Sequence, residues 1–267
     1  MIEYISMFMK FNLEIQKETK NILDKALDNP LSVEDANYLM NVQGQDFFAL
    51  LATADKVREE LVGNRVTFIN NCNINFTNIC KVRCGFCGFG KDSTDSEAYI
   101  LNDEQIVAKG QNAVENGAHE FTLMGGVLPE ADIDYYEHLL RLLKDHFPNQ
   151  LIHGFSPTMV YDAAKVSEMD IKDAFIALKK AGLDSLPGTA AEILTDRSRK
   201  IICPDKVTTQ QWVDVVETAH KVGIPGSATM MYGHVETMEE RVETMDILRT
   251  VQHDTHGFTE FIPMTFM

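Results

Sequence analysis

The alternation of short apolar runs with amphipathic helical patterns constrains the fold of this chain more than any other feature. From Arg65 onward, runs rich in β-branched and apolar residues are separated by segments in which apolar residues recur at helical spacing. The candidate strands are 66–76, 120–124, 151–155, 184–186, 227–232 and 259–264, and the candidate helices lie around 106–114, 135–143, 171–178, 212–219 and 242–248. Three helical segments run into a glycine that is followed at once by a strand, at Gly117, Gly182 and Gly223. Strands joined by helical crossovers form a parallel sheet, so the pattern predicts an α/β fold, either a barrel or an open doubly wound sheet.

The first part of the chain has a different pattern. Residues 1–64 are polar-faced and helical in periodicity, and Ser32-Val33-Glu34-Asp35 resembles a capping box after Pro30. We therefore expect an N-terminal helical segment over 1–64, followed by the α/β domain over 65–267.

The last predicted strand is not followed by a helix. The chain ends at Met267, directly after this strand. We therefore expect a truncated C-terminus, with uncovered apolar surface beside Phe261, Met264 and Phe266.

Charge and composition exclude several classes of protein. The chain has 40 acidic against 24 basic side chains, a formal net charge of −16, which opposes a general role in binding nucleic acid or an anionic membrane. The N-terminus carries Glu3 and Lys10 and lacks the long apolar stretch of a signal peptide, and no uncharged stretch is long enough to span a bilayer. These features predict a cytoplasmic protein with a small-molecule partner.

Three of the five cysteines fall within eight residues. Cys80, Cys84 and Cys87 have the spacing C-x3-C-x2-C on the loop after the first predicted strand. Three thiolates can hold three irons of a 4Fe-4S cluster and leave the fourth iron open, whereas an electron-transfer cluster normally has four cysteines. The alternative is a zinc-stabilised binding module completed by Cys72, Cys203 or a histidine, although zinc sites usually combine two separated ligand pairs. Without a second thiol at ligand spacing, Cys72 and Cys203 are interpreted as small buried apolar residues.

This motif, with an aromatic residue before the third cysteine, resembles that of the radical S-adenosylmethionine (SAM) superfamily. The resemblance implies a partial (β/α)6 TIM-like barrel, a 4Fe-4S cluster on Cys80, Cys84 and Cys87, and SAM on the open iron. SAM would then be cleaved to methionine and a 5′-deoxyadenosyl radical. By the same resemblance, the residues expected around SAM are Phe86, Gly125, Gly126, Glu192, Gly233 and Glu236, with Arg197 or Arg199 as candidates for its carboxylate.

The second half of the chain narrows the resemblance. The segments 187–192, 202–204, 228–237 and 257–263 are similar to the group that contains the two subunits of the deazaflavin FO synthase and two menaquinone-pathway enzymes, aminofutalosine synthase and dehypoxanthine futalosine cyclase. Pro187-Gly188-Thr189-Ala190-Ala191-Glu192 most resembles the second FO synthase subunit. That resemblance implies transfer of the 4-hydroxybenzyl group of L-tyrosine to 5-amino-6-(D-ribitylamino)uracil, in coenzyme F420 biosynthesis. It also implies an electron donor and the first FO synthase subunit as partners. A menaquinone-pathway reaction is the alternative.

Polar residues at the ends of predicted strands are candidates for substrate contacts. Asn75 follows the first strand, His153 and Ser156 the third, and His234 the fifth. In a barrel such residues surround the opening of the lumen, where they can orient a pyrimidine and a ribityl chain.

Overall fold

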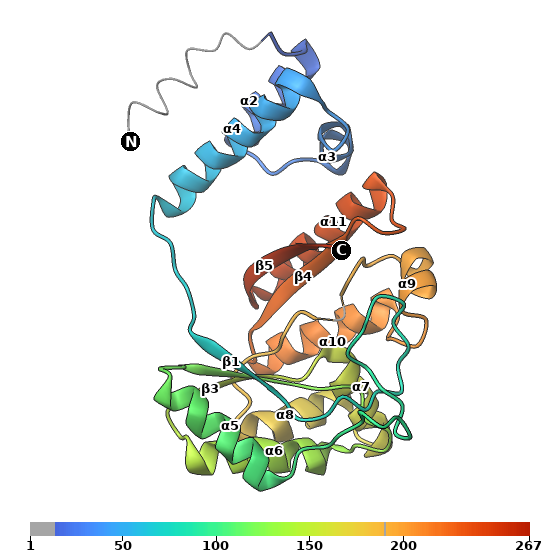
Figure 1. The fold of residues 1–267 in the computed structure, drawn as a ribbon. Coiled ribbons are helices and arrows are strands. Elements are labelled where there is room, and N and C mark those ends of the chain that lie inside the picture. The colour runs from blue at the N-terminus through green and yellow to red at the C-terminus, as the bar shows by residue number, and fades with distance from the viewer. Residues whose placement is uncertain (1–13, 190) are drawn as a thin grey trace. The chain divides into compact units, whose positions relative to one another are not determined.

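The chain divides into two compact units, which a computed structural model describes over residues 14–189 and 191–267. The first unit is 1–67 and the second is 68–267, and Figure 1 shows the course of the chain through both. The sequence predicts the boundary after residue 64.

The first unit is helical. Its helices are α2 (Lys17–Ala26), α3 (Val33–Leu39) and α4 (Gly44–Val62). The side chain of Ser32 accepts the N–H of Asp35 at 3.0 Å and so begins α3. A small core stabilises the unit, made of Ile22, Leu23, Leu39 and Ala49. The helical segment expected over 1–64 is helical from α2 to α4. Residues 1–13 of that segment lie outside the described residues.

The second unit contains parallel strands in chain order. The strands are β1 (Asn71–Asn75), β2 (Glu120–Met124), β3 (Leu151–Gly154), β4 (Gly226–Tyr232) and β5 (Phe258–Thr265). They pair as β1-β2-β3 and β4-β5, all parallel. Single parallel bridges from His153 to Ser185 and from Leu186 to Gly226 connect the two sheets. The segment around 185 therefore stands as a fourth, rudimentary strand between β3 and β4.

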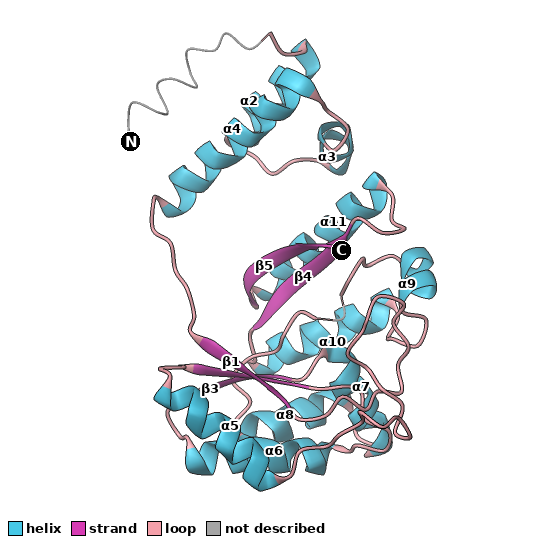
Figure 2. Cartoon of the chain, viewed as in Figure 1, coloured by secondary structure: helices cyan, strands magenta, loops and turns pink. Residues whose placement is uncertain are grey.

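Helices cover one face of these strands, as Figure 2 shows. They are α5 (Asp103–Glu115), α6 (Ile133–His146), α7 (Pro157–Val166), α8 (Ile171–Ala181), α10 (Thr209–Val222) and α11 (Met238–Thr255). The short helix α9 (Asp196–Ile202) lies outside the main core, and its Ile202 belongs to a separate small cluster. The main core packs Ile74, Phe121 and Ile152 from the strands against residues such as Leu139 and Trp212 from the helices. We call the opposite side of the strands the inner face. The predicted parallel α/β arrangement is confirmed.

Several local predictions need correction. The first strand was expected over 66–76, but it begins at Asn71, because the ladder starts only where the His119 N–H donates to the Asn70 carbonyl at 2.8 Å. Upstream of it, Val66 and Phe68 are 88% and 90% exposed. The strand expected over 184–186 is reduced to single bridges, and helices α7 and α9 were not predicted.

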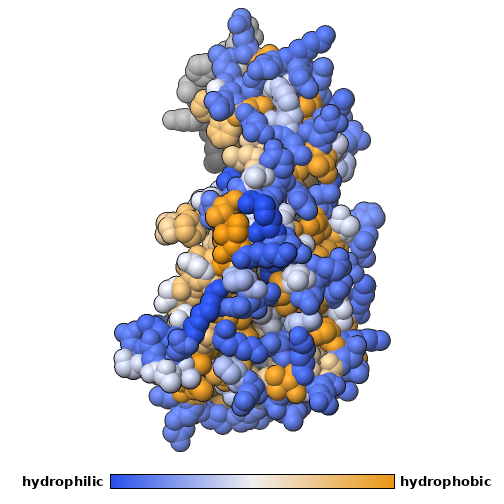
Figure 3. All heavy atoms as spheres, turned by 90° about the vertical axis from the view of Figure 1, so that its right-hand side faces the viewer, coloured by the Kyte–Doolittle hydropathy of each residue, from blue (hydrophilic) through white to orange (hydrophobic). Residues whose placement is uncertain are grey.

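The edge strand β5 leaves apolar side chains exposed. Phe261, Met264 and Phe266 are 45%, 38% and 43% exposed, as the sequence predicts. On the face drawn in Figure 3, hydrophilic residues predominate and apolar ones gather in smaller patches. Among the helices that the structure describes, none combines the length and the apolar character needed to cross a membrane.

Candidate functional site

The cysteines lie on a long loop between β1 and α5 that is held at its base by buried polar side chains. The amide of Asn78 donates to the Glu97 carbonyl and accepts the Tyr99 N–H, both at 2.8 Å. The hydroxyl of Thr77 donates to the Tyr99 carbonyl at 2.8 Å. Because these bonds join the two ends of the loop, they restrict where the cysteines can lie.

Cys80 is held between the two ends of its loop and the loop after β2. Its N–H donates to the Lys91 carbonyl at 3.0 Å. Its Sγ accepts the N–H of Val127 at 3.2 Å, and its thiol contacts the Val82 carbonyl at 3.4 Å. Hydrogen bonds to a ligating sulfur are one of the ways in which a protein adjusts an iron–sulfur cluster. Cys80 therefore has an environment suited to a ligand.

The two glycines after β2 allow close contact with this loop. A Cβ on Gly126 would lie 2.2 Å from the Ile79 carbonyl oxygen and 2.7 Å from the Cys80 Cβ, and one on Gly125 would lie 3.0 Å from the Phe76 ring. Only glycine permits such an approach. The structure thus brings the predicted glycine motif against the first cysteine, while contact between these glycines and SAM stays a prediction.

Cys84 and Cys87 lie further along the loop. Cys84 packs against a small apolar cluster that contains Cys203 and Met231. Burial raises the pKa of the Cys84 thiol to about 11, and the nearby Lys206 ammonium opposes this rise. Cys87 is exposed, and its N–H donates to the Cys84 carbonyl at 3.1 Å.

The three thiols supply the right donors but are not gathered around one point. Over residues 14–189 and 191–267, no group of three His, Cys, Asp or Glu side chains is placed to hold a metal ion. Three thiols within eight residues are the donor set of an iron–sulfur cluster with an open iron. The residues therefore fit such a group.

A buried ion pair lies beside the cysteine loop. Lys206 Nζ is 2.6 Å from Glu192 Oε1, and the two side chains are 12% and 6% exposed. The same ammonium lies 5.3 Å from the centre of the Phe86 ring. Burial lowers the pKa of Lys206, but the Glu192 carboxylate outweighs it, so this pKa is raised overall. Glu192 itself has a φ of +49°, a conformation uncommon for a residue with a side chain.

Removing Lys206 is expected to destabilise the fold strongly. In Lys206→Met the Glu192 carboxylate stays buried without its cation, and breaking a buried pair in this way costs about 3 to 5 kcal/mol. The Lys221–Glu217 pair on α10 is a matched control, since its side chains are 65% and 26% exposed and Lys221→Met should cost less than about 1 kcal/mol. Urea unfolding measures both, and adding Glu192→Gln to Lys206→Met should restore most of the loss. Equal stability of the two methionine variants would show that the pair at Glu192 contributes little.

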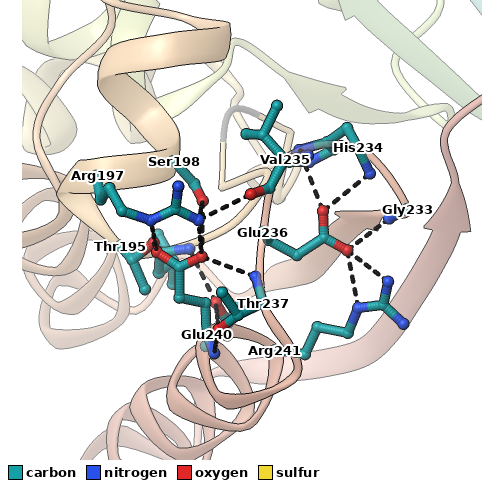
Figure 4. Close-up of polar contacts among 12 residues, drawn as sticks. Thr195, Arg197, Ser198, Gly233, His234, Val235, Glu236, Thr237, Glu240 and Arg241 are labelled. Carbon is teal, nitrogen blue, oxygen red and sulfur yellow. Dashed lines mark hydrogen bonds and ion pairs between the residues drawn. The ribbon is translucent and has the colours of Figure 1, made fainter.

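The turn after β4 is built around Glu236, as Figure 4 shows. This carboxylate accepts the N–H groups of Gly233 at 2.6 Å and His234 at 2.9 Å, and Arg241 Nε donates to it at 2.8 Å. Burial raises the pKa of Glu236, but these donors outweigh it and the pKa is lowered overall. Gly233 has a φ of +99°, which the turn requires. The structure therefore shows Gly233 and Glu236 shaping the turn, and their contact with SAM stays a prediction.

His234 belongs to the same turn. Its Nδ1 accepts the N–H of Val235 at 2.7 Å, so its Nε2 carries the proton and donates to the Met231 carbonyl at 2.9 Å. Both ring nitrogens are thus already used within the turn.

The two arginines considered for the SAM carboxylate have other partners. Arg197 Nε donates to Glu240 Oε1 at 2.8 Å, and this interaction lowers the pKa of Glu240 to about 2 (Figure 4). Arg199 is 3% exposed and donates to the carbonyls of Ala191 and Val207, at 2.5 and 3.0 Å. Both arginines therefore organise the segment around α9.

The residues expected to contact substrate do not all lie on the inner face with free polar groups. His153 is on the inner face, and its Nδ1 lies 2.7 Å from Ser185 Oγ. Ser156 instead caps α7 by accepting the N–H of Met159 at 3.3 Å, and it is 6% exposed. Asn75 ends β1, where its carbonyl accepts the Tyr99 hydroxyl at 3.3 Å.

Sequence reasoning missed Lys206, because no local pattern connects it with Glu192.

Two histidines with lowered pKa values predict a loss of stability on mild acidification. Burial lowers the pKa of both His153 and His220 to about 4. Since an unfolded histidine titrates near 6.5, the unfolded chain binds more protons than the native one between pH 6.5 and 4, and the free energy of unfolding falls as the pH drops. By pH 5 each histidine should cost about 2 kcal/mol. Urea unfolding at pH 7 and pH 5 should show a smaller drop for His220→Gln than for wild type. His253→Gln, at an exposed site, is the control, and an unchanged drop in His220→Gln would contradict the assignment.

The fold and the cysteine loop together define a class of enzyme. Residues 74–248 match the family described as the radical SAM superfamily. The chain belongs to this superfamily, and the family predicted from the sequence is confirmed.

Curated relatives point to one branch of it. Over 255 residues the chain is 51% identical to the 5-amino-6-(D-ribitylamino)uracil--L-tyrosine 4-hydroxyphenyl transferase of Methanothermobacter thermautotrophicus, covering 96% of this chain and 70% of that protein. It is 45% identical over 251 residues to the 5-amino-6-(D-ribitylamino)uracil--L-tyrosine 4-hydroxyphenyl transferase 1 of Methanosarcina acetivorans, covering 94% and 65%. The chain therefore spans about two thirds of the length of these relatives.

Solved structures share the fold at low sequence identity. Methylornithine synthase (PylB) is 20% identical with a TM-score of 0.69, over 94% of this chain and 68% of that one. The [FeFe]-hydrogenase maturase HydG is 18% identical with a TM-score of 0.74, over 99% and 58%. These similarities confirm the predicted partial barrel.

Proposed function

We propose that the chain is a radical SAM transferase that joins the 4-hydroxybenzyl group of L-tyrosine to 5-amino-6-(D-ribitylamino)uracil. The other products would be 2-iminoacetate, methionine and 5′-deoxyadenosine. The 51% identity with a transferase of this name, across 96% of the chain, carries the proposal. It favours this function over a menaquinone-pathway reaction and over a zinc-stabilised binding module.

In this proposal the residues around the cysteine loop hold the cofactors. Cys80, Cys84 and Cys87 ligate a 4Fe-4S cluster, which with SAM supplies the 5′-deoxyadenosyl radical when both are bound. The residues around SAM are Phe86, Gly125, Gly126, Glu192, Gly233 and Glu236. Lys206 occupies Glu192 Oε1, and the Oε2 atom makes no hydrogen bond with the described residues, so it can accept one from a ligand. Lys206 thereby fixes the orientation of the carboxylate.

The partners and compartment follow from the same proposal. The product would enter coenzyme F420 biosynthesis with the first FO synthase subunit as a partner, and an electron donor would reduce the cluster. All five cysteines are free thiols, which suits the reducing cytoplasm.

An anaerobic coupling assay tests the function. Reconstituted protein is incubated with SAM, dithionite, tyrosine and the aminouracil, and products are followed by mass spectrometry. We expect 5′-deoxyadenosine together with a coupled product that carries the ring of isotope-labelled tyrosine. A coupled product that forms equally well without tyrosine would refute the proposal, and turnover of dehypoxanthine futalosine instead would establish the alternative.

A further inference from the structure

Four polar residues occupy one level of the inner face. Asn73 pairs with Thr122 between β1 and β2, and Thr122 pairs with His153 between β2 and β3. His153 in turn bridges to Ser185. Residues in register on parallel strands project to the same side of a sheet, so these four form a continuous row, which we call the polar row.

The polar row faces away from the helices. The residues next to it along the strands, Ile74, Phe121, Leu123 and Ile152, are all buried in the core beneath the helices. Because side chains alternate along a strand, the row projects from the inner face. Its side chains are not fully buried: Asn73 is exposed, and the other three are partly exposed. Among the described residues the His153 ring makes one hydrogen bond, between Nδ1 and Ser185 Oγ at 2.7 Å. Its Nε2 is therefore available to a ligand.

The row carries hydrogen-bonding capacity without charge. Asparagine, threonine and serine are neutral, and burial lowers the pKa of His153 to about 4, so its ring is neutral near pH 7. Acidic residues border the row but do not belong to it. Glu120, which is 8% exposed, pairs with Asn71 one level away, and its pKa is raised by burial and by the nearby Glu260. Asp184, next to Ser185, is paired with Lys144 of α6 at 2.7 Å. The zwitterionic head of an amino acid needs charged partners, whereas a pyrimidine and its hydroxylated chain need neutral donors and acceptors.

We propose that the polar row binds the uncharged aminouracil through its pyrimidine edge or ribityl hydroxyls, and does not bind tyrosine. The inference rests on the proposed function and adds which of the two substrates this face holds. The His153–Ser185 pair suits this role, because the proton in their hydrogen bond can belong to either residue. His153 Nε2 can thus donate to a hydroxyl or accept from a ring N–H.

Equilibrium binding without a reductant tests the proposal, since SAM is then not cleaved and the substrates stay intact. Calorimetry on the anaerobic, cluster-loaded protein measures the Kd of 5-amino-6-(D-ribitylamino)uracil and, separately, of tyrosine. Thr122→Val and Ser185→Ala each remove one hydroxyl from the row, and Thr218→Val removes one from the surface of α10. We expect the first two to raise the Kd of the aminouracil about 5-fold or more. The Kd of tyrosine should change less than about 2-fold, and Thr218→Val should change neither.

The failures can be told apart. If wild-type protein binds the aminouracil and forms product while Thr122→Val and Ser185→Ala bind it equally well, the role of the polar row is overturned and the proposed function stands. A rise in the Kd of tyrosine alone would also overturn it, because the row would then hold the other substrate. Absence of both binding and product in wild type would overturn the proposed function as well.

Discussion

Cys84→Ala is expected to yield protein that assembles no 4Fe-4S cluster and forms no 5′-deoxyadenosine. Three thiolates hold three of the four irons and leave the fourth for SAM, so the cluster needs all three. Without Cys84, the loop has no other thiol at the same spacing that could replace it. Iron and sulfide content after anaerobic reconstitution and 5′-deoxyadenosine formation measure the effect.

The matched control is Cys72→Ala. Cys72 lies in β1, outside the cysteine loop, and its loss should leave the iron content and SAM cleavage near wild type. Full iron content in Cys84→Ala would show that Cys84 is not a ligand. Equal loss in both variants would show a general effect of removing a thiol.

Gly126→Ala is expected to displace the first cysteine and to lower cluster content by more than half. The new Cβ would lie 2.2 Å from the Ile79 carbonyl oxygen and 2.7 Å from the Cys80 Cβ. Since the atoms in the way belong largely to the backbone, the cysteine loop itself has to move. Overpacking of this kind costs about 1 to 3 kcal/mol, and the Val127 N–H bond to Cys80 Sγ would be strained with it.

A glycine of the cysteine loop, Gly88, provides the control. A Cβ on Gly88 meets nothing within 4 Å, so Gly88→Ala should keep both its cluster and its thermal stability. Iron content and thermal unfolding of the two variants are compared side by side. If Gly126→Ala retained full iron content, the close packing of the glycine turn on Cys80 would not matter for cluster binding.

Local sequence patterns predicted much of the fold. The strand over 120–124 has the predicted bounds, and β4 and β5 lie within one residue of theirs, because each is a short run of apolar and β-branched residues with clear ends. The three glycine stops all have positive φ in the structure. Helix α7 was missed even though Ser156-Pro157 is a cap followed by proline at the first helical position.

The site was only partly predictable. The cysteine spacing is a local signal and identified the superfamily. The Glu192–Lys206 pair depends on how the chain folds back around α9, and the polar row depends on the register of four strands, so neither has a pattern in the sequence. Three polar side chains that suggest ligand contacts have partners within the fold instead: Ser156 caps a helix, Arg197 pairs with the Glu240 carboxylate, and Arg199 donates to a backbone carbonyl.

Metal and sulfide analysis of anaerobically purified, reconstituted protein tests most directly whether the three-cysteine loop holds a cluster with an open iron. The account predicts about four irons and four sulfides per chain. One zinc per chain without sulfide would contradict it, because a closed zinc site offers no iron to SAM.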